Sequence, residues 1–165
     1  MCGIAGYVGD RESADVLVDA LSKLEYRGYD SAGIAVFDHG NIKVKKCKGR
    51  LANLVEKMDE EGKPQGHVGI GHTRWATHGE PSDINSHPHG NKRVTIVHNG
   101  IIENYKKLKD FLVGEGYSFA SETDTEVAAK LLDYYYDGDP MKTIAKVLSE
   151  IKGSYALGIM FRDFP

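Results

Sequence analysis

The chain has 165 residues, of which 41% are hydrophobic and 27% are charged, so it can bury one substantial core and we expect one domain. Its formal net charge is −3 and its acidic and basic residues are interspersed, which excludes the basic patches typical of nucleic-acid-binding and membrane-surface proteins. The opening apolar run is too short for a signal-peptide core and long apolar spans are absent from the sequence, so we expect a cytoplasmic protein that acts on small molecules or proteins.

Hydrophobic periodicity predicts strands and helices along the whole chain. The predicted strands cover residues 4–8, 33–37, 42–44, 68–71, 94–97 and 155–161, with a hairpin turn between the second and the third. The apolar stripes of the predicted helices cover residues 16–24, 51–58, 102–112, 127–135 and 144–151. Asp10 or Ser13 can cap the first helix, Thr123 or Asp124 can open the fourth, and Pro140 can begin the fifth. This balance predicts an α+β or α/β fold in which sheets lie between helices.

Residues 72–89 have neither a helical nor a strand period and contain Gly79, Pro81 and Pro88. We therefore predict a long loop, and loops of this length in a compact domain usually carry function.

The first residues of the chain suggest a nucleophile at the amino terminus. Removal of Met1 would leave Cys2 with both a thiol and an α-amine, so that one residue would carry a nucleophile and its base. The β-prone run that follows at once indicates that this terminus is tied into a sheet. The other cysteine, Cys47, lies in a lysine-rich segment with strand character, and we interpret it as structural.

A thiol nucleophile that acts on a free amino acid amide needs three kinds of partner. The substrate carboxylate needs a guanidinium, its ammonium needs a carboxylate, and the tetrahedral intermediate needs two N–H donors. Arg74, Asp124 and the pair Asn99 and Gly100 can supply them. Each also has an ordinary interpretation: a surface ion pair for Arg74, a helix cap for Asp124, and a type I′ turn for Asn99 and Gly100.

Five segments in series carry a resemblance to a known family. They are CGI at residues 2–4, YRGYDSAG at 26–33, GHTRWATHG at 71–79, HNGIIENY at 98–105 and SETDTE at 121–126. Together they resemble the glutaminase domain of the class II glutamine amidotransferases, which are N-terminal nucleophile hydrolases. Within that family they are similar to the branch that makes glucosamine 6-phosphate, more than to asparagine synthetases or amidophosphoribosyltransferases.

The resemblance implies an α+β fold, a four-layer αββα sandwich with the terminal cysteine at a strand end between two antiparallel sheets. It also implies that Cys2 attacks the side-chain amide of L-glutamine, releasing ammonia and leaving a glutamyl thioester that water cleaves. Enzymes of the branch that makes glucosamine 6-phosphate continue with sugar-isomerase domains that bind fructose 6-phosphate. We therefore expect residues 1–165 to be a glutaminase domain that is incomplete at its C-terminal end, needs no cofactor or metal, and belongs to a homo-oligomer when full length.

The resemblance further implies a role for each residue of the motifs. The implied roles are oxyanion stabilisation for Asn99 and Gly100, binding of the substrate carboxylate for Arg74 and Thr77, binding of its ammonium for Asp124, shaping of the binding loop for His78 and Gly79, gating of the ammonia exit for Trp75, and ordering of the terminus for Arg27.

Two other kinds of function remain open. Six of the seven histidines lie close together in the sequence, and histidine is the commonest metal ligand; they are His67, His72, His78, His87, His89 and His98. Their spacing lacks a regular ligand pattern, and the simpler interpretation is that they are polar loop residues, some of which support the site from behind the residues that touch the substrate. A second alternative is a binding module that senses glutamine without hydrolysing it, which would not depend on the thiol of Cys2.

Overall fold

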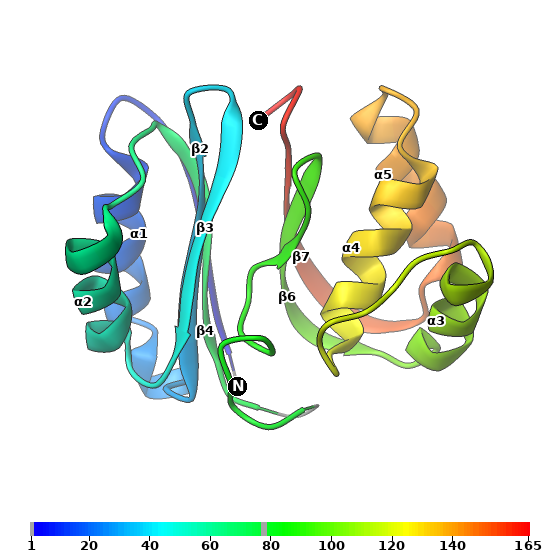
Figure 1. The fold of residues 1–165 in the computed structure, drawn as a ribbon, viewed down its shortest axis with the longest axis horizontal. Helices are drawn as coiled ribbons and strands as arrows, with labels where there is room; N and C mark the ends of the chain where they lie inside the picture. Colours follow the sequence, from blue (N-terminus) through cyan, green and yellow to red (C-terminus); the bar gives the residue numbers. More distant parts are fainter. Residues whose placement is uncertain (1, 77–78) are drawn as a thin grey trace.

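The computed structural model describes residues 2–76 and 79–165 of the chain. Two β-sheets lie face to face, and helices cover the outer face of each (Figure 1). Sheet A has the strand order β1-β4-β2-β3, and sheet B has the order β5-β6-β7. Neighbouring strands in both sheets run antiparallel. The expected four-layer αββα sandwich of the α+β class is confirmed.

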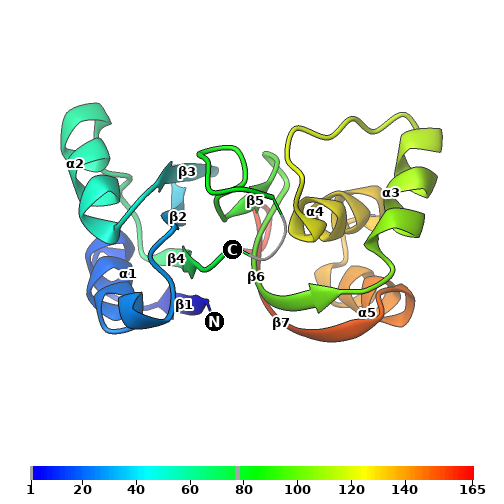
Figure 2. The same cartoon turned by 90° about the horizontal axis from the view of Figure 1, so that it is seen from below.

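The elements divide into two halves along the chain. Sheet A contains β1 (Gly3–Val8), β2 (Ser31–Asp38), β3 (Asn41–Lys48) and β4 (Val68–Arg74), and its helices are α1 (Ser13–Ser22), a short 3-10 turn η1 (Glu25–Arg27) and α2 (Leu51–Glu61). Sheet B contains β5 (His89–Gly90), β6 (Val94–Ile102) and β7 (Gly153–Phe161), and its helices are α3 (Tyr105–Gly114), α4 (Asp124–Tyr135) and α5 (Pro140–Glu150). Figure 2 shows the same layers from below. Among the described residues, every helix falls short of the length and apolarity that crossing a membrane requires.

Strand alternation explains how each sheet fills a core on both of its faces. In β2, Ile34 and Val36 pack with residues of α1 and α2, whereas Ala35 belongs to a cluster between the two sheets. In β6, Ile96 packs with the outer helices of sheet B, whereas Val97 belongs to the inner cluster. The buried members of the inner cluster are Ala35, Ile70, Val97 and Met160. Full burial of a valine, isoleucine or methionine side chain contributes roughly 2 kcal/mol to folding.

The same alternation carries polar residues to one end of the inner layer. Asn99 follows Val97 by two residues on β6, so it also faces sheet A. His72 and Arg74 continue the inward-facing series of β4, and Cys2 precedes the first residue of β1. Side chains from both sheets and from the terminus therefore converge where the strands end.

The predicted strands are confirmed, but two corrections apply to the predicted loop of residues 72–89. β4 continues to Arg74, because His72 pairs with Ile4 on one side and with Gly33 on the other. The short strand β5 at His89–Gly90 pairs with β6 and ends the loop earlier than predicted.

The first predicted helix differs at both ends. Its N-cap is Glu12, without a side-chain hydrogen bond to the helix, so neither Asp10 nor Ser13 caps it. It ends at Ser22, and Leu24 lies between α1 and η1. The break allows the chain to turn towards the end of β4, where Arg27 lines the cavity described below.

The other helices begin close to their predicted positions. Ile102 ends β6 instead of opening a helix, because its backbone pairs with β7. Thr123, and not Asp124, caps α4, since the Thr123 hydroxyl accepts a hydrogen bond from the N–H of Glu126 at 3.2 Å. Pro140 stands at the first turn of α5, as predicted.

Candidate active site

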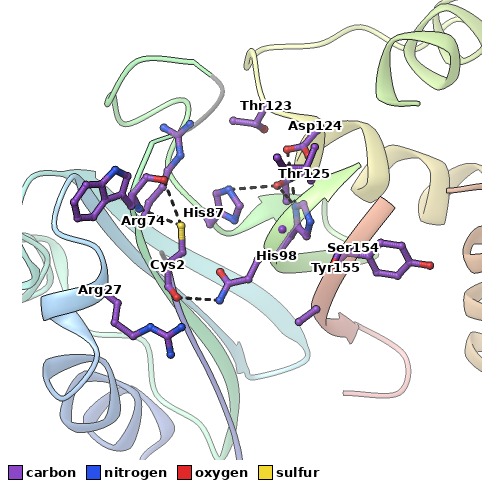
Figure 3. Close-up of a pocket in the computed structure, with 15 residues that line it drawn as sticks. Cys2, Arg27, Arg74, His87, His98, Thr123, Asp124, Thr125, Ser154 and Tyr155 are labelled. Carbon is purple, nitrogen blue, oxygen red and sulfur yellow. Dashed lines mark hydrogen bonds and ion pairs between the residues drawn. The ribbon is translucent and has the colours of Figure 1, made fainter. Parts of the chain in front are cut away.

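A cavity of about 530 Å³ opens at the end of the inner layer (Figure 3). Its volume lies within the range of sites that bind small molecules. Both sheets, the N-terminal turn of α4 and the amino terminus contribute to its wall. The lining residues are Cys2, Arg27, Arg74, Trp75, His87, His98, Asn99, Gly100, Ile101, Thr123, Asp124, Thr125, Ser154, Tyr155 and Ala156.

Cys2 is half-buried in the wall of this cavity. Its Sγ accepts a hydrogen bond from the backbone N–H of Trp75 at 3.1 Å and lies 3.4 Å from the Trp75 carbonyl oxygen, to which the thiol can donate. Its own carbonyl oxygen accepts a hydrogen bond from Nδ2 of Asn99 at 3.1 Å. Because Gly3 pairs with Thr73 of β4, the sheet holds the terminus against the cavity.

Arg74 is 4% exposed, so its interpretation as part of a surface ion pair is wrong. Its Nη2 donates a hydrogen bond to the carbonyl oxygen of Gly79 at 3.0 Å. Burial lowers the pKa of the guanidinium, and electrostatic attraction to Cys2, Asp30 and Asp124 opposes that shift. A buried guanidinium at the edge of a cavity is suited to binding a ligand carboxylate.

Asp124 is the first residue of α4 and is 6% exposed. Its Oδ2 accepts a hydrogen bond from the backbone N–H of Ile102 at 2.9 Å, and its Oδ1 lies 3.9 Å from Nδ1 of His98. The helix-cap interpretation is therefore wrong, since Thr123 has that role. Figure 3 shows Asp124 on the α4 side of the cavity and Arg74 on the β4 side, so the two opposite charges can face the two ends of a zwitterion.

Asn99 and Gly100 lie inside β6, opposite Ala156 and Tyr155 of β7. The type I′ turn interpretation is therefore wrong. Gly100 has φ +116°, and a Cβ at this position would overlap the carbonyl oxygen of Ser154. Only glycine adopts this backbone conformation without strain in so close an approach.

Four histidines form a buried cluster beside the cavity: His72, His87, His89 and His98. The rings of His72 and His87 stack with centroids 4.1 Å apart, and His87 contacts His89 edge-on at 5.0 Å. Burial lowers the pKa of His72 to about 4 and that of His89 to about 3, and it also lowers the pKa of His87 and His98. All four are therefore neutral at pH 7. His87 lies in the loop, as the loop interpretation expects, whereas His72, His89 and His98 belong to strands.

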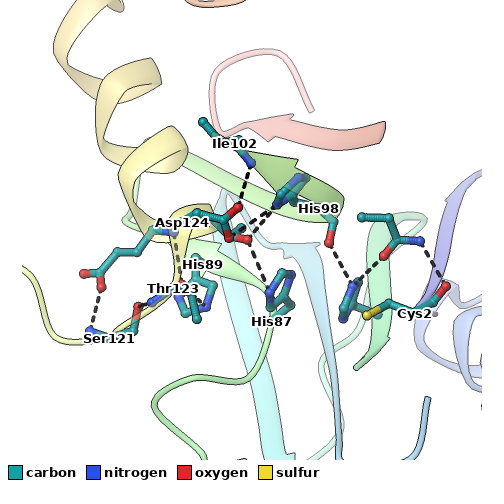
Figure 4. A network of polar contacts seen from close by, with 12 residues as sticks. Cys2, His87, His89, His98, Ile102, Ser121, Thr123 and Asp124 are labelled. Carbon is teal, nitrogen blue, oxygen red and sulfur yellow. Dashed lines mark hydrogen bonds and ion pairs between the residues drawn. The ribbon is translucent and has the colours of Figure 1, made fainter. Parts of the chain in front are cut away.

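Hydrogen bonds join this histidine cluster to the first turn of α4. His98 Nδ1 and His87 Nε2 lie 2.9 Å and 3.3 Å from the hydroxyl oxygen of Thr125, and His89 Nε2 lies 3.1 Å from that of Thr123. Figure 4 shows the contacts running from α4 through β6 to Cys2. Within residues 2–76 and 79–165, the structure contains no group of three His, Cys, Asp or Glu side chains that could hold a metal ion.

A half-buried lysine supports the segment that carries His87. The Nζ of Lys46 donates hydrogen bonds to the carbonyl oxygens of Ser86 and Pro88, at 2.8 Å and 3.1 Å. Burial lowers the pKa of this amine to about 8. The strand β3 thereby fixes the backbone on both sides of His87.

The residues assigned to the edge of the site lie near Cys2. The ring of Trp75 is 46% exposed and packs edge-on against Tyr29, with centroids 5.6 Å apart. Arg27, in η1, lines the cavity beneath the terminus. Both residues are in contact with the space around Cys2, so the η1 turn and the end of β4 form one rim.

Gly79 lies on the loop that follows β4. Its φ is +75°, and a Cβ there would approach Nδ2 of Asn85 to 2.6 Å. Because its carbonyl oxygen accepts the hydrogen bond from Arg74, Gly79 holds the guanidinium at the cavity. Thr77 and His78, the other predicted binding residues of this loop, lie outside the described residues.

One wall of the cavity was not predicted. Ser154, Tyr155 and Ala156, at the start of β7, lie opposite residues 99–101 of β6 and line the cavity. Their segment has an ordinary strand pattern, and only the pairing register brings it to the site. Thr125 and the four buried histidines were not among the residues predicted to contact the substrate. The sequence gives a weak indication for two of them, since His72 and His98 interrupt otherwise apolar strands.

The two thiols of the chain lie in different environments. Cys47, in β3, is 7% exposed and belongs to the core beneath α1 and α2. Burial raises the pKa of its thiol, which makes the reactive thiolate less accessible. Both cysteines are free, so Cys2 is the thiol that faces a ligand cavity.

Comparison with known proteins gives consistent results. A family model described as a glutamine amidotransferase domain matches residues 72–164. The chain is 58% identical over its full length to the isomerizing glutamine–fructose-6-phosphate aminotransferase of Clostridium tetani, and 51% identical over 99% of its length to that of a Thermus thermophilus strain. It spans 27% of the length of each of these proteins.

Solved structures share the fold. The glutamine phosphoribosylpyrophosphate amidotransferase of B. subtilis superposes with a TM-score of 0.84 at 29% identity, over 98% of this chain and 35% of that one. A structure described as the allosteric regulatory enzyme of purine biosynthesis superposes with a TM-score of 0.86, also at 29% identity, over 98% of this chain and 36% of that one.

Proposed function

Because this chain belongs to the glutamine amidotransferase domain family, with the four-layer fold of the N-terminal nucleophile hydrolases, we propose that it hydrolyses the side-chain amide of L-glutamine. One observation carries this assignment: the thiol of Cys2 shares a single cavity with a guanidinium, a carboxylate and two N–H donors. The charges match the two ends of an amino acid, and the donors match the oxyanion of amide hydrolysis. These groups belong to Arg74, Asp124, Asn99 and Gly100.

The proposed reaction begins after removal of Met1. The free α-amine of Cys2 takes the proton of the thiol, and Sγ attacks Cδ of glutamine. The C–N bond then breaks, the amine returns the proton to the leaving nitrogen, and ammonia departs. Water cleaves the resulting glutamyl thioester and releases glutamate. The N–H of Trp75, which donates to Sγ, stabilises the thiolate before attack.

Each tetrahedral intermediate places negative charge on the former amide oxygen. In this mechanism Nδ2 of Asn99 and the backbone N–H of Gly100 donate to that oxygen, a type of interaction whose removal typically lowers kcat by about 10²–10³-fold. The other assignments are carboxylate binding by Arg74 and Thr77, ammonium binding by Asp124, shaping of the loop by His78 and Gly79, gating of ammonia release by Trp75, and ordering of the terminus by Arg27.

A glutamine analogue with an electrophilic group at Cδ tests the nucleophile. It should label the chain with one equivalent, at Cys2 by mass spectrometry, and excess glutamine should protect the thiol. Cys47 is the internal control, since it is a buried thiol in the same chain. Labelling at Cys47 alone would refute the assignment.

Glutamate release then separates hydrolysis from mere sensing of glutamine. Cys2→Ala and retention of Met1 should each abolish turnover, while isothermal titration should still detect glutamine binding to the Cys2→Ala variant. Turnover by that variant would exclude a Cys2 nucleophile. If a chelator abolished turnover while Cys2→Ala did not, a metal-dependent reaction would replace the proposed one.

We further propose that residues 1–165 are the glutaminase part of a longer aminotransferase. The identity of 51–59% to several isomerizing glutamine–fructose-6-phosphate aminotransferases, against 29% to the phosphoribosylpyrophosphate enzyme, favours this branch of the family. Sugar-isomerase domains further along the chain would then use the ammonia to convert fructose 6-phosphate into glucosamine 6-phosphate. The proposal includes a homo-oligomer that acts in the cytoplasm, where thiols such as Cys2 remain reduced.

The full-length protein provides the test of this second proposal. With glutamine and fructose 6-phosphate it should form glucosamine 6-phosphate, and with phosphoribosylpyrophosphate as the acceptor it should form no phosphoribosylamine. The opposite pair of results would assign the chain to the purine branch.

A further inference from the structure

The ring nitrogen Nε2 of His72 lies between two oxygen atoms behind the cavity wall. The carbonyl oxygen of His98 is 3.0 Å away, and Oδ1 of Asn99 is 2.9 Å away. His72 is 1% exposed and stacks on the ring of His87. It therefore touches the site only through its neighbours.

The carbonyl contact determines which nitrogen of His72 carries the proton. A carbonyl oxygen can only accept a hydrogen bond, so the nitrogen that contacts His98 must be an N–H donor. The other nitrogen, Nδ1, is buried and has no hydrogen-bond partner among the described residues. A proton there would be a buried donor without an acceptor, which is costly. Neutral His72 is therefore the Nε2–H tautomer, and burial, which lowers its pKa to about 4, keeps it neutral.

This tautomer determines the orientation of the Asn99 amide. Since His72 Nε2 donates, the atom of Asn99 that faces it must be the acceptor Oδ1. At the other end, the carbonyl oxygen of Cys2 can only accept, so the atom that faces it must be the donor Nδ2. Both contacts require the same orientation. One hydrogen of Nδ2 bonds to Cys2, and the second is available on the cavity side, where Asn99 is a lining residue.

We infer that His72 is a positioning residue, which holds the side-chain amide of Asn99 in the orientation that presents Nδ2 to the oxyanion. The inference rests on the proposed glutaminase function. Two hydrogen bonds hold the Asn99 amide, one with His72 and one with Cys2. Without the donor at His72, the bond to Cys2 remains alone, and the Asn99 amide can rotate away from the reacting carbon of the substrate. The transition state would lose stabilisation, whereas the ground-state contacts of glutamine with Arg74 and Asp124 would not change.

Two variants of nearly equal size test this role. His72→Gln keeps an N–H donor close to the position of Nε2, whereas His72→Met removes the donor and keeps an unbranched side chain. His72→Met should lower kcat for glutamine by about tenfold to a hundredfold, less than removal of a whole oxyanion donor, and should leave KM unchanged. His72→Gln should restore most of kcat. His67→Met, at an exposed histidine outside the cavity, is the matched control and should have the activity of the unchanged chain.

Alkylation of Cys2 by iodoacetamide separates positioning from a general disturbance of the site. This displacement forms no oxyanion, so its rate should be the same in the unchanged chain and in both His72 variants. If alkylation slows together with kcat in His72→Met, or if His72→Gln loses as much kcat as His72→Met, the role is structural and the inference is wrong. An unchanged kcat in folded His72→Met also overturns it.

The tautomer can be measured directly in the unchanged chain. Long-range ¹H–¹⁵N correlation should show a proton on Nε2 of His72 and none on Nδ1, and this decides the matter if His72→Met does not fold. A proton on Nδ1 overturns the inference. Failure of the proposed function is a separate result, since the unchanged chain with a free α-amine would then release no glutamate from glutamine.

Discussion

The side-chain nitrogen of Asn99 donates a hydrogen bond to the backbone carbonyl oxygen of Cys2, at 3.1 Å and across 97 positions of the sequence. Asn99 belongs to sheet B and Cys2 leads into sheet A. The contact therefore exists only when the two sheets are packed together. Assembly of the proposed oxyanion site and docking of the two halves of the sandwich are one structural event.

Replacement of Asn99 tests the oxyanion site. Asn99→Asp substitutes an oxygen for the donor Nδ2, so kcat for glutamine should fall by about 10²-fold while KM changes little. Steady-state release of glutamate and ammonia measures both constants. Asn53→Asp, on the exposed side of α2, is the matched control, and a folded Asn99→Asp variant with normal kcat would exclude Asn99 as a donor.

Replacement of Asp124 separates binding from folding. Asp124→Asn removes the charge that would pair with the substrate ammonium, so KM for glutamine should rise by about tenfold to a hundredfold, and each factor of ten corresponds to about 1.4 kcal/mol. The asparagine Oδ1 can still accept from the N–H of Ile102, so the midpoint of thermal unfolding should change little. A normal KM would remove Asp124 from the proposed binding site.

Gly100 and Gly114 form a matched pair for backbone strain. Gly100→Ala forces a Cβ into the Ser154 carbonyl at φ +116° and should cost at least about 1–3 kcal/mol of unfolding free energy. Gly114→Ala, at the end of α3 with open space around it, should be neutral or stabilise by up to about 1 kcal/mol. Urea unfolding measures both, and equal stability of the two variants would contradict the strain at Gly100.

The four buried histidines predict a dependence of stability on pH. The pKa of each is lower in the folded chain than its ordinary value of 6.5, reaching about 4 for His72 and about 3 for His89. The unfolded chain therefore binds more protons as pH falls below about 6.5, and unfolding becomes easier. Above about pH 6.5 the rings are neutral in both states and their burial has no effect on the pH dependence. Below it the free energy of unfolding falls, down to about pH 4 for His72 and about pH 3 for His89, with a slope of up to about 1.4 kcal/mol per pH unit for each histidine.

Carboxylates act in a lower range of pH. Burial alone would raise the pKa of Glu126, but hydrogen bonds from Ser121 and Ala120 outweigh it and lower the pKa to about 2, against an ordinary value of 4.5. The contribution of Glu126 to the free energy of unfolding is therefore lost only below about pH 4.5. Urea unfolding between pH 7 and pH 5 therefore isolates the histidines, and His89→Gln should reduce the slope in that range. A stability that is constant from pH 7 to pH 5 would mean that the four rings are not buried together.

Several features of the site could be predicted because they depend on chemistry that is local in the sequence. A cysteine directly after Met1 and directly before a β-prone run indicates a candidate nucleophile that the adjoining strand holds in place. Arg74 and Asp124 have the charges that a zwitterion requires, and Thr123 opens α4 with a side-chain cap that acts within three residues. The strands and helices followed from periods of two and 3.6 residues, which are also local properties.

Other features depended on pairing between distant segments. Asn-Gly favours a turn by its own conformational preference, yet Asn99 and Gly100 continue a strand, because β7 supplies partners for their backbone. His72 extends β4 for the same reason, with β1 on one side and β2 on the other.

The sequence by itself determined the element types, the four-layer class through its motifs, and the identity of the charged groups and of the thiol proposed as the nucleophile. Only the tertiary structure decided that Arg74 and Asp124 are buried at one cavity, that Ser154 to Ala156 form part of its wall, and that His72 contacts Asn99. The physical reason is that charge and period belong to residues and short segments, whereas burial, register and the direction of a hydrogen bond arise only when two sheets meet.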